Sequence, residues 1–412
     1  MTTIALILIA VVLFELIIFF HEGGHFITAK KSGIKVNEFA LGMGPKIFSF
    51  TKGETTYSLR LFPIGGYCAM EGEDEDSNNP RAFNNAPIWK RMIVIVAGAA
   101  MNILFGLVLM MITLLPQDQF ASTTVSQFAP SSFSAVTGLQ EGDKIVRIND
   151  YDVYTSTDFS FALYTLPVSE VDGSELSVYK EDCAFDLYVR TTELVDENTT
   201  EEQNAALVKA LQTAQTEISK TESKEAAYKI FSEYYNSLAD IVDKEHAQEI
   251  PTIEERETRQ RFRTDMTVVR DGIKTELKGV DLLTLKKSAD DDTPQLKIDF
   301  YIEPIEKNFG TVMQQTFAST VSVVRMVWGS LIGLIKGQFS LNDMSGPVGI
   351  ASAITEVAGE SLRTSGFGSA VSSIVYVMMV ITINLGVVNM LPFPALDGGR
   401  FATSDINDLY RR

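Results

Sequence analysis

The stretch HEGGH near the N-terminus places His21, Glu22 and His25 at the HExxH spacing. On a helix, two histidines four residues apart lie on one face and can bind one metal ion. Glu22 is offset along the same helix, where its carboxylate can take a proton from a water molecule that zinc has made acidic. The activated water can attack a carbonyl, and Glu22 can return the proton to the leaving amine. The spacing predicts a zinc hydrolase with Glu22 as catalytic base.

HExxH is a common pattern, and it is informative here because of its position in the chain. It directly follows the apolar run 3–20, which is about long enough to span a bilayer. The run lacks a basic start and a small-residue cleavage site, so we interpret it as a retained transmembrane helix. Ionisable residues at the end of such a helix are costly unless they have a function. Glu15 lies about two turns before Glu22, and we expect it either to line the cavity, to pair with another span, or to be merely tolerated.

The two histidines leave a catalytic zinc site without its third ligand. The chain has three histidines, and the third, His246, lies in a charged stretch, so a carboxylate is the expected ligand. In the stretch NMLPFPALDGGR, Asp397 is the acidic residue of an otherwise apolar segment. Pro392 and Pro394 interrupt the helix there, and irregular backbone at membrane depth is tolerated only where it is buried or lines a cavity. A helix end capped by glycine is the alternative, but it leaves the lone aspartate unexplained.

Further apolar runs predict more spans. Residues 92–116 and 370–393 are each long enough, whereas 311–336 contain Arg325 and many Ser and Thr, so we expect an interfacial helix there. Lysines after the first span and Lys90-Arg91 before the second place these ends in the cytoplasm and the N-terminus outside. The net charge of −18 offers no basic patch for nucleic acid. Cys68 and Cys183 would lie on opposite sides of the membrane, so no disulfide is expected.

The residue patterns of two segments between the spans predict β-structure. Residues 42–76 alternate apolar and polar side chains around a turn at Lys52-Gly53, as a β-hairpin does. The stretch GLQEGDKIVRIND within 134–163, followed by a helix capped near Ser156 and Thr157, resembles the A-G-L-x-x-G-D-x-I-x-x-I-N-G pattern of protease-associated PDZ domains. Thr137 and Asp150 depart from that pattern. PDZ domains bind extended peptide by strand addition; a small sheet domain without a ligand is the alternative.

Residues 193–263 contain no glycine and are rich in Glu, Lys, Ala and Gln. Leu207, Leu211, Ala214 and Ile218 recur at helical spacing, which predicts an acidic helical insertion within the PDZ-like domain. The expected organisation begins with a first transmembrane helix with HExxH (1–25), a cytoplasmic-side loop with the membrane-associated β-hairpin (26–91) and a second transmembrane helix (92–116). The PDZ-like domain (117–192), the insertion (193–263) and strands completing that domain (264–305) follow. An amphipathic or membrane-abutting segment (306–369), a third transmembrane helix with LDGG (370–400) and a polar tail (401–412) complete it.

Taken together, HExxH at the end of a first span and N-x-x-P-x-P-x-L-D-G-G far downstream resemble the paired signature of the site-2 protease family of intramembrane zinc metalloproteases. The stretches GPKIF, YSLRLFPIGGY and LNDMSGPVGIA extend the likeness to the bacterial regulator-of-sigma-E protease type with one PDZ domain. The resemblance implies that His21, His25 and Asp397 bind Zn²⁺ and that Glu22 is the catalytic base. It further implies that Asn389 and Pro392 hold the substrate strand, and that the hairpin presents an unwound substrate.

The family cuts single-pass membrane proteins, often anti-sigma factors, after a first protease has trimmed them. The resemblance therefore implies a polytopic α-helical protein of the bacterial inner membrane, with the N-terminus and PDZ-like region extracytoplasmic and the active site near the cytoplasm. The family usually has a fourth span after L-D-G-G, whereas we expect about three in this chain. Two alternatives remain: a membrane-anchored PDZ adaptor with an inactive or incomplete metal site, and a zinc-dependent membrane enzyme of other chemistry, such as lipid hydrolysis.

Overall fold

The computed structural model describes residues 2–73, 75, 77–128, 132–165, 176–195, 199–244, 250, 261–285, 295–337, 347–393 and 396–399. The predictions for His246, for Pro394 and for the tail 401–412 lie outside these residues. The chain divides into two compact units. One comprises residues 1–120 and 306–412, and the other comprises residues 121–305.

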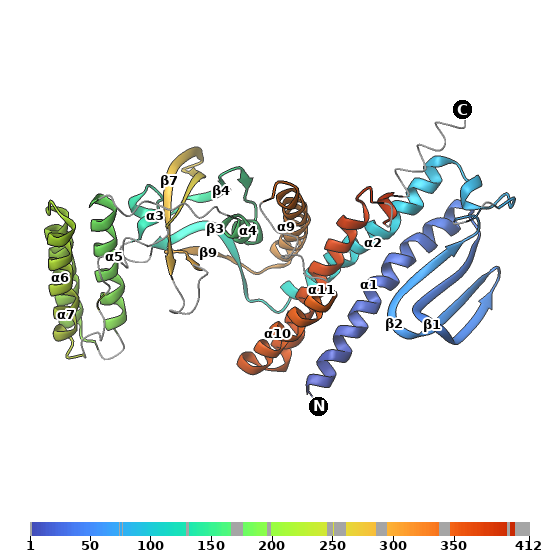
Figure 1. The fold of residues 1–412 in the computed structure, drawn as a ribbon, viewed down its shortest axis with the longest axis horizontal. Helices are drawn as coiled ribbons and strands as arrows, with labels where there is room; N and C mark the ends of the chain where they lie inside the picture. Colours follow the sequence, from blue (N-terminus) through green and yellow to red (C-terminus); the bar gives the residue numbers. More distant parts are fainter. Residues whose placement is uncertain are drawn as a thin grey trace. The chain divides into compact units, whose positions relative to one another are not determined.

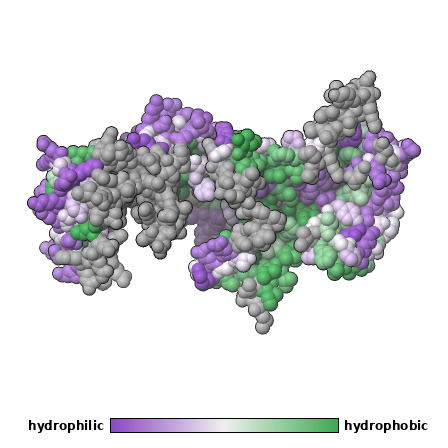
Figure 2. All heavy atoms as spheres, viewed as in Figure 1, coloured by the Kyte–Doolittle hydropathy of each residue, from purple (hydrophilic) through white to green (hydrophobic). Residues whose placement is uncertain are grey.

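The first unit is built on long apolar helices (Figure 1). Within the described residues four helices are long and apolar enough to cross a membrane: α1 (Thr2–Ser32), α2 (Ile88–Leu114), α9 (Phe309–Ile335) and α11 (Phe367–Asn389). A further helix, α10 (Pro347–Ser365), packs against α11. Hydrophobic side chains cover much of the face of these helices in Figure 2. The expectation of about three such helices is therefore wrong.

The additional helix is α9, for which we expected an interfacial position. It packs against α2 and α11, and four of its hydroxyl residues are buried, whereas Phe317, Trp328 and other large apolar residues are exposed. The four are Thr316, Ser319, Thr320 and Ser322. The Thr316 and Thr320 hydroxyls donate to carbonyls one turn earlier in the same helix, at 2.8 and 2.7 Å. Buried hydroxyls are thus satisfied within the helix, and its apolar side chains face outward, as a lipid environment requires. Polar content misled the sequence interpretation because it did not show on which face the polar residues lie.

The predicted β-hairpin is confirmed, and one of its strands pairs with two separate parts of the other. It consists of β1 (Val36–Lys52) and β2 (Thr55–Met70), joined by a turn in which Gly53 has a φ of +65°. Both strands bend sharply near the glycines that the sequence places in them. As a result the first half of β1 lies between two parts of β2: Phe39 is paired with Tyr57 on one side and with Cys68 on the other. The last residues of β2, Gly66–Met70, therefore form an outer edge.

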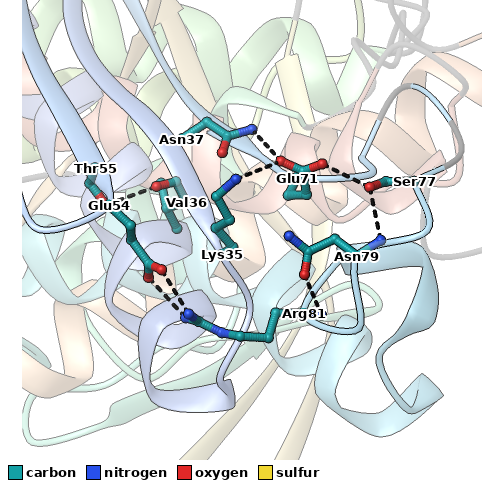
Figure 3. Close-up of polar contacts among 9 residues, drawn as sticks. All are labelled: Lys35, Val36, Asn37, Glu54, Thr55, Glu71, Ser77, Asn79 and Arg81. Carbon is teal, nitrogen blue, oxygen red and sulfur yellow. Dashed lines mark hydrogen bonds and ion pairs between the residues drawn. The ribbon is translucent and has the colours of Figure 1, made fainter.

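A polar network joins the base of this hairpin to the end of α1 (Figure 3). Arg81 donates to both carboxylate oxygens of Glu54, at 2.7 and 2.8 Å, and Lys30 of α1 also donates to Glu54 at 2.8 Å. Glu71 accepts from Ser77, Lys35 and Asn37 at 2.7–3.1 Å. Donors from Arg81 and Lys30 lower the pKa of Glu54 to about 2, and those from Ser77, Lys35 and Asn37 lower that of Glu71 to about 2. We call these contacts the hairpin latch.

The second unit contains a seven-stranded sheet in the order β8-β7-β6-β4-β3-β9, with β5 beside β4. The GLQEGDKIVRIND stretch follows α3 and supplies β4, and the strands that we expected after the insertion pair with β4 through β6. The helix α4 begins one residue earlier than predicted, because Thr155 and Asp158 form the capping box. Its strands and helices are β3 (Gln119–Phe128), α3 (Phe133–Val136), β4 (Lys144–Ile148), β5 (Tyr151–Asp152), α4 (Ser156–Tyr164), β6 (Arg261–Arg270), β7 (Ile273–Leu285), β8 (Gln295–Lys297) and β9 (Phe300–Glu306).

The insertion is helical, but it begins before residue 193. It comprises α5 (Leu176–Leu194), α6 (Glu201–Ser219) and α7 (Lys224–Ile241), which share their own hydrophobic core. All four residues that we selected on α6 by their spacing are buried in that core. Cys68 and Cys183 are both free and lie in different units.

Candidate metal centre and active site

The histidines of HExxH lie on one face of α1, as their spacing predicts. Their side chains are buried, with His21 9% and His25 7% exposed. Their Nε2 atoms are 3.4 Å apart. The motif does not end the helix, which continues for two turns to Ser32. The rings are therefore held by helix on both sides and by the elements packed around them.

Asp397 reaches the histidines from the far end of the chain. Its Oδ2 lies 3.2 Å from Nε2 of His21 and 3.3 Å from Nε2 of His25. The chain bends after α11, and residues 397–399 start a new helical segment. Asp397 is thus at the beginning of that segment, and the alternative of a capped helix end does not describe it. Gly398 is required here because a Cβ atom would overlap the carbonyl of Leu391.

His25 is oriented by the second transmembrane helix. Its Nδ1 donates to the Val94 carbonyl of α2 at 2.8 Å. A carbonyl can only accept, so in the neutral ring the proton sits on Nδ1 and Nε2 presents a lone pair. The side chain of Asn102, also on α2, lies 3.1 Å from Nδ1 of His21. Gly98 between them lets both rings approach the α2 backbone, since a Cβ there would overlap the His25 ring.

The side-chain atoms of His21, His25 and Asp397 are better placed to bind a metal ion than to hydrogen-bond to one another. Ligand atoms of His21, His25 and Asp397 all lie within 4.8 Å of each other. Oδ2 of Asp397 is buried and has no hydrogen-bond partner among the described residues. The lone pair on Nε2 of His25 cannot donate to it, so these two electron pairs face each other at 3.3 Å. Two imidazole nitrogens and one carboxylate oxygen form a ligand set that catalytic zinc accepts, with one position left for water or substrate.

Glu22 lies beside this group and faces the hairpin. Its carboxylate accepts a hydrogen bond from the backbone N–H of Cys68 in β2. A Cβ atom at Gly66 would lie 3.6 Å from Cγ of Glu22 and 2.9 Å from the Ile18 side chain. The edge Gly66–Met70 therefore runs directly past the Glu22 carboxylate. Glycine at position 66 allows this close approach.

A cavity of about 420 Å³ opens between the hairpin edge and the metal ligands. It is lined on one side by Tyr67 to Met70 and Glu73, and on the other by the three candidate ligands, Val94 and Leu396. Its wall contains both polar and apolar groups. Its volume lies in the range of small-molecule and cofactor sites.

The remaining predicted residues lie at different distances from this centre. Asn389, at the end of α11, is buried, and its side-chain nitrogen lies 3.4 Å from Nε2 of His21. Pro392 is exposed in the bend that follows. Oε1 of Glu15 is buried and has no hydrogen-bond partner within the described chain. The structure thus places Asn389 at the metal group and Pro392 three residues further along the chain.

Sequence reasoning missed Asn102, Gly98 and the backbone groups of Val94 and Cys68. Asn102 carried a signal, because a single amide in the apolar run 92–116 is costly unless it has a partner. Small residues in an apolar helix, such as Gly98, are typical of close helix approach, but Gly98 accommodates imidazole rings. The backbone groups carry no side-chain signal at all.

Comparison with known proteins agrees with this geometry. The sequence pattern of peptidase family M50 matches residues 9–412. A candidate zinc metalloprotease of Clostridium acetobutylicum is 30% identical over 95% of this chain and 84% of its own length. The regulator of sigma-W protease RasP of Bacillus subtilis is 27% identical over 95% of this chain and 87% of its own length. A zinc metalloprotease RasP of Geobacillus kaustophilus is 28% identical, with coverage of 97% and 88%.

Proposed function

The chain belongs to peptidase family M50, and we propose that it is an intramembrane endopeptidase that cuts single-pass membrane proteins, such as anti-sigma factors, after a first cut by another protease. Zinc metalloprotease relatives and four apolar helices make it a multi-pass membrane metalloprotease whose cofactor is Zn²⁺. The observation that carries the finer proposal is the meeting of the HExxH face, Asp397 and a free strand edge in one cavity.

In this proposal His21, His25 and Asp397 hold the metal. When bound, zinc polarises the scissile carbonyl and makes the attacking water more acidic. Burial of the ligands supports the assignment, because electrostatic interactions are stronger where water is excluded. Val94 and the α2 backbone keep His25 facing the same point.

Glu22 is the catalytic base of the proposal. Its carboxylate takes the proton from the attacking water, and the same oxygen gives that proton to the nitrogen of the leaving amine. The Cys68 N–H fixes one side of the carboxylate toward the hairpin edge. A bound peptide that lies along this edge therefore has its scissile bond next to Glu22.

The edge Gly66–Met70 is the proposed substrate platform. A transmembrane helix hides its peptide bonds in its own hydrogen bonds, so it must be unwound before cleavage. An extended segment can replace those bonds with hydrogen bonds to a free strand edge. Among the described strands, only β1 pairs with Gly66–Met70, and Tyr67 to Met70 line the cavity. The N–H groups of Cys68 and Met70 bond to the Glu22 and Glu73 carboxylates, which a substrate strand would have to replace at this edge. Asn389 and Pro392 are proposed to hold the opposite side of the segment.

The second unit is proposed to be a PDZ-like domain that binds extended peptide outside the cytoplasm. Its β9 is the last strand in the sheet order and is paired with β3 among the described strands. Phe159 of α4 and Phe300 of β9 lie with ring centroids 6.1 Å apart, so α4 flanks this edge. A strand edge beside a helix is the arrangement that strand addition requires. The basic residues after α1 support an orientation with the N-terminus outside and the metal group near the cytoplasm of an inner membrane.

The test is Glu22→Gln in the full chain, with the exposed Glu356→Gln on α10 as the matched control. In purified protein with a transmembrane reporter, Glu22→Gln should lower the cleavage rate by roughly 10²–10⁴-fold while zinc stays bound. In cells, single-pass stubs should accumulate in membranes that contain this variant, and their sequences identify the substrates. Cleavage by Glu22→Gln at the wild-type rate would show that the assignment of the base is wrong.

A further inference from the structure

Asn102 is a polar side chain at the centre of the apolar helix α2, and it is fully buried. A buried amide at membrane depth is unfavourable unless it makes hydrogen bonds. Its amide nitrogen Nδ2 lies 3.1 Å from Nδ1 of His21, whose other ring nitrogen Nε2 lies near Asp397. The amide therefore contacts the His21 ring at Nδ1, whereas the candidate metal position lies at Nε2.

The chemistry of a metal-binding imidazole decides how this contact must be made. If Nε2 of His21 is to offer its lone pair to a metal, Nδ1 must carry the proton and needs an acceptor. The carbonyl of Val94 is that acceptor for His25. For His21, the matching group is the amide oxygen of Asn102. The amide nitrogen faces Nδ1 of His21, and a half-turn of the amide places the oxygen there instead. The oxygen Oδ1 is otherwise buried without a hydrogen-bond partner in the described chain.

The α11 helix holds Asn102 in place. The hydroxyl of Thr382 donates to the backbone carbonyl of Asn102 across the helix interface, at 3.3 Å. Gly386 lets α11 approach α2, since a Cβ atom there would lie 2.9 Å from the Ala99 carbonyl and 3.3 Å from Cβ of Asn102. This close packing fixes the position of the amide relative to the ring. The same helix α11 leads into Asn389 and Asp397, so it positions both sides of His21.

We propose that Asn102 is a positioning residue that accepts the Nδ1 proton of His21 and thereby keeps Nε2 available to the metal. The proposal rests on the assignment of His21 as a zinc ligand. The partner behind a histidine ligand fixes its tautomer and its ring orientation, and its loss typically weakens metal binding by roughly 10–100-fold. Asn102 touches neither the reacting atoms nor Asp397 in this role.

Two substitutions that keep the branching of the side chain at Cγ distinguish a hydrogen-bond acceptor from packing alone. Asn102→Leu fills the space but cannot accept a proton, whereas Asn102→Asp keeps an acceptor oxygen. The control, Thr113→Val on the same helix, removes a hydroxyl that bonds to carbonyls of its own turn. Zinc affinity of the full-length protein in detergent is measured by competition with a chelator. The absorption spectrum of the cobalt-substituted protein reports the ligand geometry.

We expect Asn102→Leu to bind zinc roughly 10–100-fold more weakly and to change the cobalt spectrum. Asn102→Asp and Thr113→Val should keep the wild-type affinity, or exceed it in the case of Asp. Wild-type zinc binding by Asn102→Leu would overturn the proposal, as would equal losses for Asn102→Leu and Asn102→Asp. If Asn102→Leu does not fold, weak zinc binding by a folded Asn102→Asp overturns it alone. His21→Ala distinguishes a failure of the proposal for Asn102 from a failure of the ligand assignment. If that variant keeps zinc, His21 is not a zinc ligand.

Discussion

Gly98 of α2 lies directly against the imidazole of His25. A Cβ atom at position 98 would overlap Nε2 of that ring and would lie 2.9 Å from Cε1 of His21. The metal group thus depends on a missing side chain in a neighbouring helix as much as on the ligands themselves.

Gly98→Ala should therefore push the rings apart or move α2 away from α1. We expect zinc affinity to fall by at least roughly tenfold, because the ligand geometry changes, and protein stability to fall by about 1–3 kcal/mol through overpacking. Zinc content after dialysis and thermal unfolding measure the two effects. Gly359→Ala is the control, because nothing lies within 4 Å of a Cβ atom at that helical position. Full zinc retention by Gly98→Ala would contradict the geometry.

Removal of zinc should destabilise the first unit as well as stop catalysis. Without a cation, the Nε2 lone pair of His25 and the buried Oδ2 of Asp397 face each other at 3.3 Å, beside Nε2 of His21. At a zinc concentration of 100 times the dissociation constant, the bound ion should stabilise the fold by about 2.7 kcal/mol. Thermal unfolding with chelator and after zinc is restored measures this change. Asp397→Ala should abolish the zinc-dependent shift, and a shift that survives in that variant would place the ion elsewhere.

Cys68 contributes its backbone to the site, not its thiol. Burial raises the pKa of this thiol, which keeps it protonated and unreactive. Cys68→Ala should therefore cut a reporter at nearly the wild-type rate. Cys68→Pro removes the N–H that bonds to Glu22, which should cost about 1.5–3 kcal/mol of transition-state stabilisation, or roughly 10- to 100-fold in rate. Equal activity of the two variants would refute a role for the strand edge.

The hairpin latch should control how firmly β2 is held beside Glu22. Arg81→Ala removes the paired contact to Glu54, so we expect faster hydrogen exchange at the β2 amides and a lower cleavage rate. Lys31→Ala, a nearby exposed cation at the end of α1, is the control. An unchanged exchange rate in Arg81→Ala would show that the latch does not position the hairpin.

The latch also predicts a pH dependence of the wild-type protein. The folded pKa of Glu54 is lowered to about 2 from an ordinary 4.5, so its contribution is complete above 4.5 and is lost as the pH falls toward 2. Digestion by pepsin across this range should cut the hairpin increasingly as the pH falls. Glu54→Gln should be cut readily throughout. The same pH profile in both proteins would argue against the latch.

In the second unit, Arg270 is predicted to be essential for stability. It forms a bidentate pair with Asp143, whose carboxylate is fully buried, at 2.7 Å. Arg270→Ala leaves that charge unpaired and should destabilise the unit by about 3–5 kcal/mol. Hydrogen exchange at the β4 and β6 amides of the full chain measures the loss. Arg147→Ala, which breaks an exposed pair with Asp152, should cost at most about 1 kcal/mol. Similar losses in both variants would contradict the importance of burial.

The sequence by itself determined which residues are the candidates for the chemistry and most of the elements that hold them. HExxH, the lone Asp397, the apolar runs, the hairpin turn and the spacing of Leu207 and Leu211 are local patterns, and local patterns follow directly from residue type and periodicity. The same local view failed at α9, because composition does not tell which face of a helix meets lipid.

Only the tertiary structure decided how these parts meet. The distances between His21, His25 and Asp397, the contact of Asn102 with His21, and the strand edge beside Glu22 all join residues far apart in the chain. They depend on helix packing through Gly98 and Gly386 and on backbone groups of Val94 and Cys68. Such groups are the same in every residue, so no residue type in the sequence reveals them, and packing alone turns them into parts of a site.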